Sequence, residues 1–339
     1  MAQRPRVTVL GSLNTDISLP VPHLPGPGET VLGTAAASIG TGGKGANQAV
    51  AAARLGAATA IVGCCGQDEF GARLRAALTA EGIDVTGLRP VAGAASGLAL
   101  IIVDPAGENV IAVAPGANAL AGEAEVAAAF GAPSDALVLS AEIPVPVLAA
   151  ALRRANAEGV RSVLNLAPVP AGAAELLAHR PDWLVVNAHE AAALLGTEPP
   201  DVAGAQAMAA RLAAGETGPA AGLGATGDSG SGAGAGPEDR YVVITLGGAG
   251  AVMAGPSVAA AIGGFRVPVV DTVGAGDAFV GALAVALATG LEPAEAVRAA
   301  CAAGAAATTR RGAQDGLPRP ADVLTATGFH WSDTVTGED

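Results

Sequence analysis

Lysine is almost missing from this 339-residue chain, and charged residues of every kind are scarce. Lys44 is its single lysine, and charged residues make up 14% of the chain, against roughly 25% in an average soluble protein. The 31 acidic residues outnumber the 18 lysines and arginines, so the formal net charge is −13. We therefore expect neither nucleic acid nor an anionic membrane as a partner, because both bind positively charged surfaces.

Cysteine and long apolar runs are scarce as well. Cys64, Cys65 and Cys301 are too few and too unevenly spaced for a disulfide framework or a zinc site. The chain is 51% hydrophobic, but the excess is mostly alanine. Its longest uncharged stretches, such as residues 278–291, fall short of the about 18 to 20 residues that a membrane span needs. Because the N-terminus also lacks a signal peptide, we expect a cytoplasmic protein.

Short apolar segments alternate with helical segments along most of the chain. This rhythm predicts an α/β fold in which a parallel sheet is covered by helices on both faces. The expected strands are residues 6–11, 58–64, 136–139, 162–166, 183–186, 241–246 and 265–270. The expected helices are residues 46–55, 69–81, 145–158, 171–178, 190–195, 278–288 and 293–307.

Three further regions differ from this rhythm. Residues 18–39 contain four prolines and suit edge strands, while residues 98–103 and 109–113 resemble a strand pair. Residues 214–239 are mostly Gly, Ala, Ser, Thr and Pro, which predicts a flexible surface insertion. The tail, residues 326–339, is acidic and is expected to fray.

The most informative stretch is residues 271–277, which contains two glycines and ends in Asp277. Glycines in a turn let the backbone approach a ligand closely, and the helix that follows directs its free N–H groups toward an anion. A carboxylate at this place could take a proton while the N–H groups hold negative charge. The alternative is that Asp277 only caps the helix, because Asp is a favoured N-cap.

Two other sites carry polar residues in suggestive places. Asn14 and Asp16 follow the first strand, where ligands of open α/β sheets bind, although an exposed Asx turn would have the same sequence. Residues 40–45 match G-x-G-x-x-G, but the strand before them is weak and no acid closes the next strand, which disfavours dinucleotide binding. The loop is not a Walker A motif, since Gly45 follows Lys44. It suits a small polar ligand, or alternatively a glycine hinge ahead of a helix.

Taken together, these motifs resemble those of ribokinase-type sugar kinases of the PfkB family, over residues 6–325 apart from the insertion. Residues 11–16, 42–49, 187–190, 245–250 and 271–277 are each similar to a family motif and occur in the family's order. The resemblance implies a single domain over residues 1–339, a three-layer α/β/α fold with a mainly parallel central sheet. A small β-sheet lid from residues 14–42 and 96–114 would close over the sugar and pair with a second subunit as a homodimer.

The resemblance also implies an activity, the ATP-dependent phosphorylation of the 5-hydroxyl of ribose, and a role for each matching residue. Asp277 would be the base, beside an anion hole at Gly274, Ala275 and Gly276. The sugar-binding residues would be Asn14, Thr15, Asp16, Gly43, Lys44, Gly45, Ala46, Asn47, Glu142 and Asp277. The ATP-binding residues would be Asn187, Thr245, Leu246, Gly247, Gly248, Ala249, Gly250, Gly276, Asp277 and Cys301.

The family's cofactors are implied in the same way. Glu190 would work with magnesium through water, and the potassium site would comprise Asp271, Val273, Ala307, Arg310, Gly312 and Gly316. Two positions depart from the family pattern: Gly316 stands where a serine often contributes to the cation site, and Cys301 stands where Asn or His often meets adenine.

Other activities remain open at this point. A kinase of the same fold could act on 2-deoxyribose, another pentose, a ketohexose or a nucleoside, because lid side chains choose the sugar. A non-catalytic sugar-binding protein would not need a base at Asp277. A nicotinamide-dependent oxidoreductase would need the ribose-binding acid that the glycine loop lacks.

Overall fold

The computed structural model describes residues 4–218, 240–256 and 258–336. Most of the predicted insertion at 214–239 lies outside these residues. The described strands are β1 (Arg6–Leu10), β2 (Asn14–Pro20), β3 (Ser38–Gly42), β4 (Ala58–Gly66), β5 (Leu88–Val91), β6 (Gly97–Val103), β7 (Asn109–Ala114), β8 (Ala136–Ser140), β9 (Ser162–Asn165), β10 (Trp183–Asn187), β11 (Tyr241–Thr245), β12 (Gly250–Gly255) and β13 (Val258–Gly263).

Each predicted helix has a counterpart among the described α-helices, which are α1 (Lys44–Arg54), α2 (Glu69–Ala80), α3 (Glu123–Ala129), α4 (Val145–Glu158), α5 (Ala173–Leu177), α6 (Ala188–Leu195), α7 (Val202–Ala213), α8 (Ala275–Ala288), α9 (Pro293–Ala307) and α10 (Pro320–Thr327). Of these, α3, α7 and α10 were not predicted. None of the helices within the described ranges is long and apolar enough to cross a membrane.

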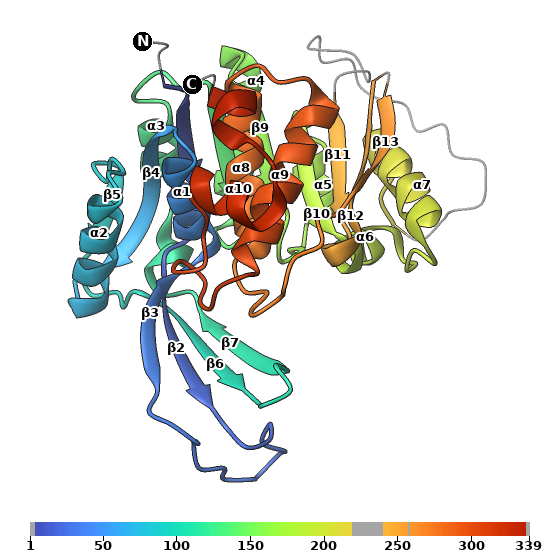
Figure 1. Cartoon of the computed structure of the whole chain (residues 1–339). Helices are drawn as coiled ribbons and strands as arrows, with labels where there is room; N and C mark the ends of the chain where they lie inside the picture. The colour runs from blue at the N-terminus through green and yellow to red at the C-terminus, as the bar shows by residue number, and fades with distance from the viewer. Residues whose placement is uncertain (1–3, 219–239, 257, 337–339) are drawn as a thin grey trace.

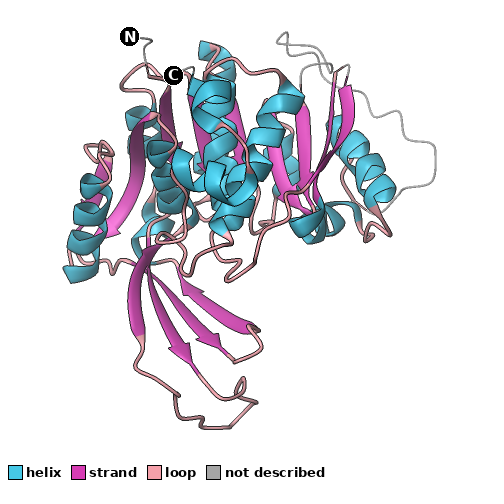
Figure 2. Ribbon diagram, in the orientation of Figure 1, coloured by secondary structure: helices cyan, strands magenta, loops and turns pink. Residues whose placement is uncertain are grey.

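Nine of the described strands form one sheet in the order β13-β12-β11-β10-β9-β8-β1-β4-β5. Neighbours from β11 to β5 pair in parallel, and β12 and β13 add an antiparallel edge. Successive side chains point to opposite faces, so Val163 joins one apolar core and Leu164 the other. Helices α1, α2, α8, α9 and α10 contribute to the core on the first face, and α3 to α7 to the core on the second (Figures 1 and 2).

A second sheet projects from one end of this body, in the order β3-β2-β6-β7 (Figure 1). Its strands fall within residues 14–42 and 96–114, the two ranges expected for a lid. All six residues of β7 are exposed, and the exposed side chains of the sheet include Leu100, Val110, Ile111 and Val113. The central sheet with helices on both faces and the separate small sheet together confirm the predicted three-layer fold.

Two sequence expectations are wrong. Residues 265–270 form no strand; Pro268 lacks an N–H to donate, Val269 and Val270 are exposed, and the edge strand is instead β13. The tail is not frayed between residues 326 and 336, because Trp331 is 1% exposed and its indole N–H donates to the Leu55 carbonyl at 3.0 Å. The apolar surface of these residues outweighs the acidic composition; residues 337–339 are outside the described part.

Candidate active site

The two ends of the site come from helices that lie against each other, α1 and α8. Helix α1 begins at Lys44, directly after Gly43, whose φ of 89° is the left-handed conformation that favours glycine. A Cβ on Gly43 would lie 2.6 Å from the backbone nitrogen of Asn14, so the loop lies tightly against the start of β2. Gly43 therefore lets the start of α1 lie close to the start of β2.

Asp277 lies in the first turn of α8, but it does not cap the helix. The N-cap is Gly274, with a φ of 81°, and the Asp277 side chain bonds to residues of α1. Its Oδ2 accepts from Asn47 Nδ2 at 2.9 Å, and its Oδ1 accepts from Gln48 Nε2 at 3.0 Å. The capping alternative is therefore wrong, and the carboxylate is fixed against the glycine-loop helix.

Asp16 and Lys44 face this carboxylate without partners of their own. Within the described residues, no group hydrogen-bonds to the Asp16 carboxylate, and the Lys44 ammonium has no ion pair. The buried Thr15 Oγ1 and Asn47 Oδ1 are likewise unpaired there. Buried polar groups without partners are costly, so this cluster fits a ligand rich in hydroxyl groups.

The charges in the cluster shift one another's protonation. Burial, then the charges of Glu142 and Asp277, raise the pKa of Asp16 to about 7. Burial also raises the pKa of Asp277, although Lys44 and the two amides oppose that change. Burial lowers the pKa of Lys44, but nearby carboxylates outweigh this effect and leave it raised, so the ammonium stays charged.

Other polar groups hold the sugar-side residues in place. Glu142 Oε2 accepts from Ser12 Oγ at 2.5 Å and from the Lys44 backbone N–H at 3.2 Å. Asn118, which is 1% exposed, donates from Nδ2 to Asn14 Oδ1 at 2.9 Å. Because this bond occupies the Asn14 oxygen, the Asn14 amide presents its NH₂ group to a ligand.

The predicted anion hole is only partly as expected. Gly274 lies against the carbonyl of Ala313, where a Cβ would come within 2.5 Å, so this turn requires glycine. The N–H of Ala275 donates to the Thr272 carbonyl at 3.3 Å. The first-turn N–H of Gly276 lacks an intrahelical acceptor by helix geometry, and it remains the better donor to an anion.

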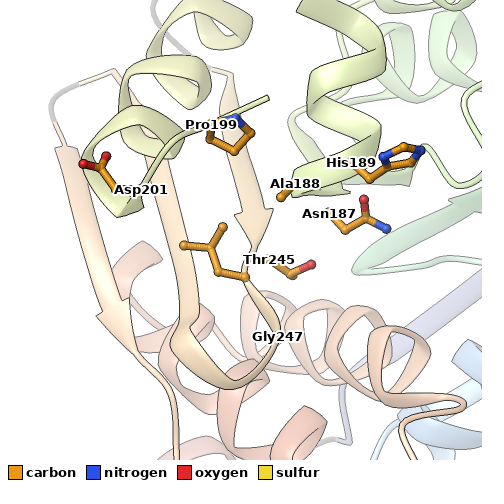
Figure 3. Close-up of a pocket in the computed structure, with 8 residues that line it drawn as sticks. Asn187, Ala188, His189, Pro199, Asp201, Thr245 and Gly247 are labelled. Atoms are coloured by element: carbon orange, nitrogen blue, oxygen red, sulfur yellow. The ribbon is translucent and has the colours of Figure 1, made fainter. Parts of the chain in front are cut away.

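The predicted nucleotide residues line a cavity of about 410 Å³ at the ends of β10 and β11 (Figure 3). Its lining contains four expected residues, Asn187, Thr245, Leu246 and Gly247, and four unassigned ones, Ala188, His189, Pro199 and Asp201. Gly248 and Ala249 lie in the 3₁₀ turn beside it, and Gly250 begins β12. Cys301 is not in this lining. It lies on α9 and is buried in the apolar core on the first face of the sheet, and burial raises its thiol pKa to about 12.

Asn187 and Glu190 form a capping box at the start of α6. Asn187 Oδ1 accepts from the Glu190 N–H at 2.8 Å, and Glu190 Oε2 accepts from the Asn187 N–H at 2.7 Å. Burial raises the pKa of Glu190, while the charge of Lys44 opposes that rise. The described residues hold no cluster of three or more His, Cys, Asp or Glu, so a divalent ion here would need ligands from phosphates and water.

The predicted potassium residues converge in the structure. Asp271 accepts from the Val273 N–H at 3.0 Å and from the Gly312 N–H at 2.9 Å, which joins the α8 turn to the turn after α9. A Cβ at Gly316 would meet the carbonyl oxygens of Gly312, Ala307 and Arg310 at 2.7, 3.2 and 3.3 Å. Three carbonyl oxygens around one point, with a carboxylate nearby, fit a monovalent cation, and the absence of a Cβ at Gly316 lets these oxygens come this close.

The model of the pfkB carbohydrate kinase family matches residues 4–229 and 226–320. The chain belongs to this family.

Named relatives agree with that membership. A ribokinase from Haemophilus influenzae is 37% identical over 95% of this chain and 98% of its own length. A ribokinase from Schizosaccharomyces pombe is 32% identical over 94% and 96%. Among solved structures, the Arabidopsis thaliana ribokinase complexed with ribose and ATP superimposes with a TM-score of 0.76 at 26% identity, over 95% of this chain and 98% of that one.

Sequence reasoning missed several buried amides of the site: Gln48, Asn118, Asn165 and Gln314. Gln48 stands within the glycine motif at residues 42–49, next to Asn47, and Asn165 is the polar residue at the carboxyl end of β9. A buried polar residue at the carboxyl end of a strand was a usable signal for Asn165. Gln314, whose Oε1 accepts from Thr41 Oγ1 at 2.5 Å, lies in the cation turn and links it to the lid.

Proposed function

We propose that this pfkB-family chain transfers the γ-phosphoryl group of ATP to the primary 5-hydroxyl of D-ribose, giving ribose 5-phosphate. One observation carries the proposal: the buried Asp277 carboxylate is fixed by Asn47 and Gln48 beside the unpaired Lys44 and Asp16. The ribokinases that match nearly the whole chain support ribose as the acceptor.

Asp277 acts as the general base in this proposal. It accepts the proton of the 5-hydroxyl as the oxygen attacks the γ-phosphorus, and its raised pKa makes it a stronger acceptor than a surface carboxylate. The free N–H of Gly276, at the turn that Gly274 and Ala275 form, holds the charge on the transferring group. Positioning and charge stabilisation supply most of the catalysis in phosphoryl transfer.

The sugar is held by groups that lack protein partners. Asp16 and Asn47 Oδ1 accept from sugar hydroxyls, while Lys44 and the Asn14 NH₂ group donate to sugar oxygens. Glu142 keeps its second carboxylate oxygen for the ligand, since Oε2 is already engaged. The remaining members of this set, Thr15, Gly43, Gly45 and Ala46, shape the loop around the sugar.

The nucleotide occupies the cavity beside Asn187 and Thr245 (Figure 3). Glu190 holds magnesium through water, and the ion neutralises phosphate charge when it is bound. Gly248, Ala249 and Gly250 follow the lining residue Gly247 in the chain, at the 3₁₀ turn and the start of β12.

The carbonyl oxygens of Ala307, Arg310 and Gly312, with Asp271 and the Val273 carbonyl, would hold a potassium ion, which would supply positive charge beside the anion hole. Asp271 itself joins the turn before α8 to the turn after α9 through its bonds with the Val273 and Gly312 N–H groups.

The exposed apolar side chains of the lid support a homodimer formed through this sheet. Val110, Ile111 and Val113 are each about half exposed on β7, and such a patch is typical of an interaction surface. Light scattering of the purified protein measures the oligomeric state directly, and a monomer at micromolar concentration would contradict the dimer. We place the protein in the cytoplasm, in keeping with its ATP substrate and the free thiols of its three described cysteines.

The test of the acceptor is a coupled ADP-release assay with ribose, 2-deoxyribose, fructose, tagatose and adenosine. The highest kcat/KM is expected for ribose. A higher value for another sugar or for the nucleoside would reassign the substrate while keeping the kinase activity. If none of these five compounds causes ADP release, the kinase proposal is overturned in favour of a sugar-binding protein.

A further inference from the structure

Gln48 is a completely buried amide in direct contact with the proposed base. It lies on α1 with 0% exposure, and its Nε2 donates at 3.0 Å both to Asp277 Oδ1 and to Asn165 Oδ1. Asn165 ends strand β9, so this one amide joins the central sheet to the first turn of α8. No part of the proposed sugar or nucleotide binding uses either residue.

The orientation of both amides is determined by their partners. Asn165 Nδ2 donates to the Val185 carbonyl at 3.3 Å, so the Asn165 oxygen must face Gln48. Gln48 then meets two oxygens and must present its NH₂ group to both. A flipped Gln48 amide would place its own oxygen against the Asn165 oxygen and the Asp277 carboxylate.

Packing alone does not explain a glutamine here. The buried Gln48 Oε1 has no hydrogen-bond partner among the described residues, and an unmet buried acceptor lowers stability. An apolar residue of similar size, such as methionine, would avoid that cost, but it would leave the Asn165 and Asp277 oxygens without this donor. The glutamine is therefore explained by what its NH₂ group does for these two oxygens.

We propose that Gln48, oriented by Asn165, is a positioning residue that fixes the plane of the Asp277 carboxylate and favours its ionised form. This inference rests on the proposed role of Asp277 as the base. Asn47 holds Oδ2 and Gln48 holds Oδ1, so the carboxylate cannot rotate, and each oxygen keeps a lone pair for the substrate proton. Hydrogen bonds donated to a carboxylate stabilise its charged form.

Several charged groups face Asp277 and set the background for this effect. Lys44 on α1 favours the ionised carboxylate, while Glu142 after β8 opposes it. The charge of Asp277 helps to raise the pKa of Asp16 on β2, and the charge of Lys44 opposes the rise in the pKa of Glu190 on α6. None of these groups is removed when Gln48 is replaced, so a change in the titration of Asp277 reports the lost hydrogen bond.

The test is the pH profile of kcat for Gln48→Met, measured with saturating ribose and ATP. Saturating ribose engages Asp16, whose own titration would otherwise overlap with that of Asp277. The acid limb of the profile is expected to move upward by about one pH unit, and kcat below the limb to fall by about tenfold. KM for ribose is expected to change by less than about threefold, because Gln48 is not a sugar-binding group.

Val50→Ala is the matched control, because it removes buried volume from the same helix at a position without a hydrogen-bonding side chain. Its acid limb is expected to coincide with that of the wild type. Asn165→Val keeps the Gln48 donor but loses the group that orients it, so its acid limb is expected to move upward by less than that of Gln48→Met. This second variant also tests the inference if Gln48→Met does not fold. The inference is overturned if the acid limb of the kcat profile lies at the wild-type pH in whichever of the two variants folds. Full activity of Asp277→Asn would instead overturn the proposed base itself.

Discussion

The carboxylate of Asp16 lies directly over the α-carbon of Gly42 on the neighbouring lid strand. A Cβ at position 42 would come within 2.1 Å of Asp16 Oδ2 and 2.4 Å of Oδ1, a contact that no side chain can make. The place of the carboxylate therefore depends on the missing side chain of Gly42.

Gly42→Ala is expected to displace Asp16 and to raise KM for ribose by at least about tenfold, since a lost hydrogen bond to a charged group is worth about 1.5–3 kcal/mol. Gly40→Ala is the matched control. It lies on the same strand, and a Cβ there would meet nothing within 4 Å. Equal KM values for the two variants would show that Asp16 does not bind the sugar.

Asp16 should also decide between ribose and 2-deoxyribose. A buried acceptor that is built for a hydroxyl rejects an analogue without it, at a cost of about 1–3 kcal/mol or more when charged. The wild type is therefore expected to prefer ribose by at least about tenfold in kcat/KM. Asp16→Ala should weaken ribose far more than deoxyribose. Equal use of both sugars by the wild type would favour the deoxyribose alternative.

The raised pKa of Asp16, about 7, predicts that ribose binding releases a proton. Hydroxyl donors favour the charged carboxylate, so bound ribose lowers this pKa. Ribose affinity should rise with pH up to about 7 and remain level above it. Calorimetry at pH 6 in two buffers of different ionisation enthalpy should show proton release, which disappears at pH 8.5 and in Asp16→Asn. Affinity that falls as the pH rises would contradict the assignment.

Asp277→Asn is expected to lower kcat by at least about 100-fold, the lower range of general-base catalysis. The amide keeps the size of the carboxylate but cannot take the substrate proton. KM for ribose should change by less than about threefold, because other residues hold the sugar. Steady-state ADP release measures both constants, and a kcat above about a tenth of the wild-type value would mean that another group is the base.

Potassium is expected to raise kcat/KM above the value in a large organic cation. Gly316→Ala should raise the potassium concentration for half-maximal activation by about tenfold, or about 1.4 kcal/mol, because its Cβ would lie within 3.3 Å of the three carbonyl oxygens. The assay is run over a potassium titration at constant ionic strength. Identical rates in both cations would remove the cation site from the mechanism.

The sequence predicted the body of the fold because buried parallel strands and their helices have strong local patterns. The hairpin of β12 and β13 was missed, since its strands are mostly alanine and glycine, with Val252, Val258 and Ile262 as their β-branched residues and no aromatic residue. Residues 265–270 were taken for a strand because three valines outweighed Pro268. In both places the local composition contradicted the pairing that the tertiary structure imposes.

The site was predicted only as far as its motifs extend. Lys44, Asn47 and Asp277 belong to motifs and meet as expected. Asn165 belongs to no motif; its contact with Gln48 spans 117 positions, and such a distance leaves no local pattern. The burial of Cys301 could not be foreseen either, since the pattern of α9 does not show which face meets the core.

The bond between Asn47 and Asp277 joins positions 230 residues apart, which has a consequence for biosynthesis. Ribosomes add about 5–20 residues each second, so roughly 10–50 s separate the emergence of the two halves of the site. During that time the nascent chain displays the sugar-binding loop without the residue that takes the substrate proton. A growing chain is therefore unable to phosphorylate sugar, and activity begins only when α8 has left the ribosome and docked on α1.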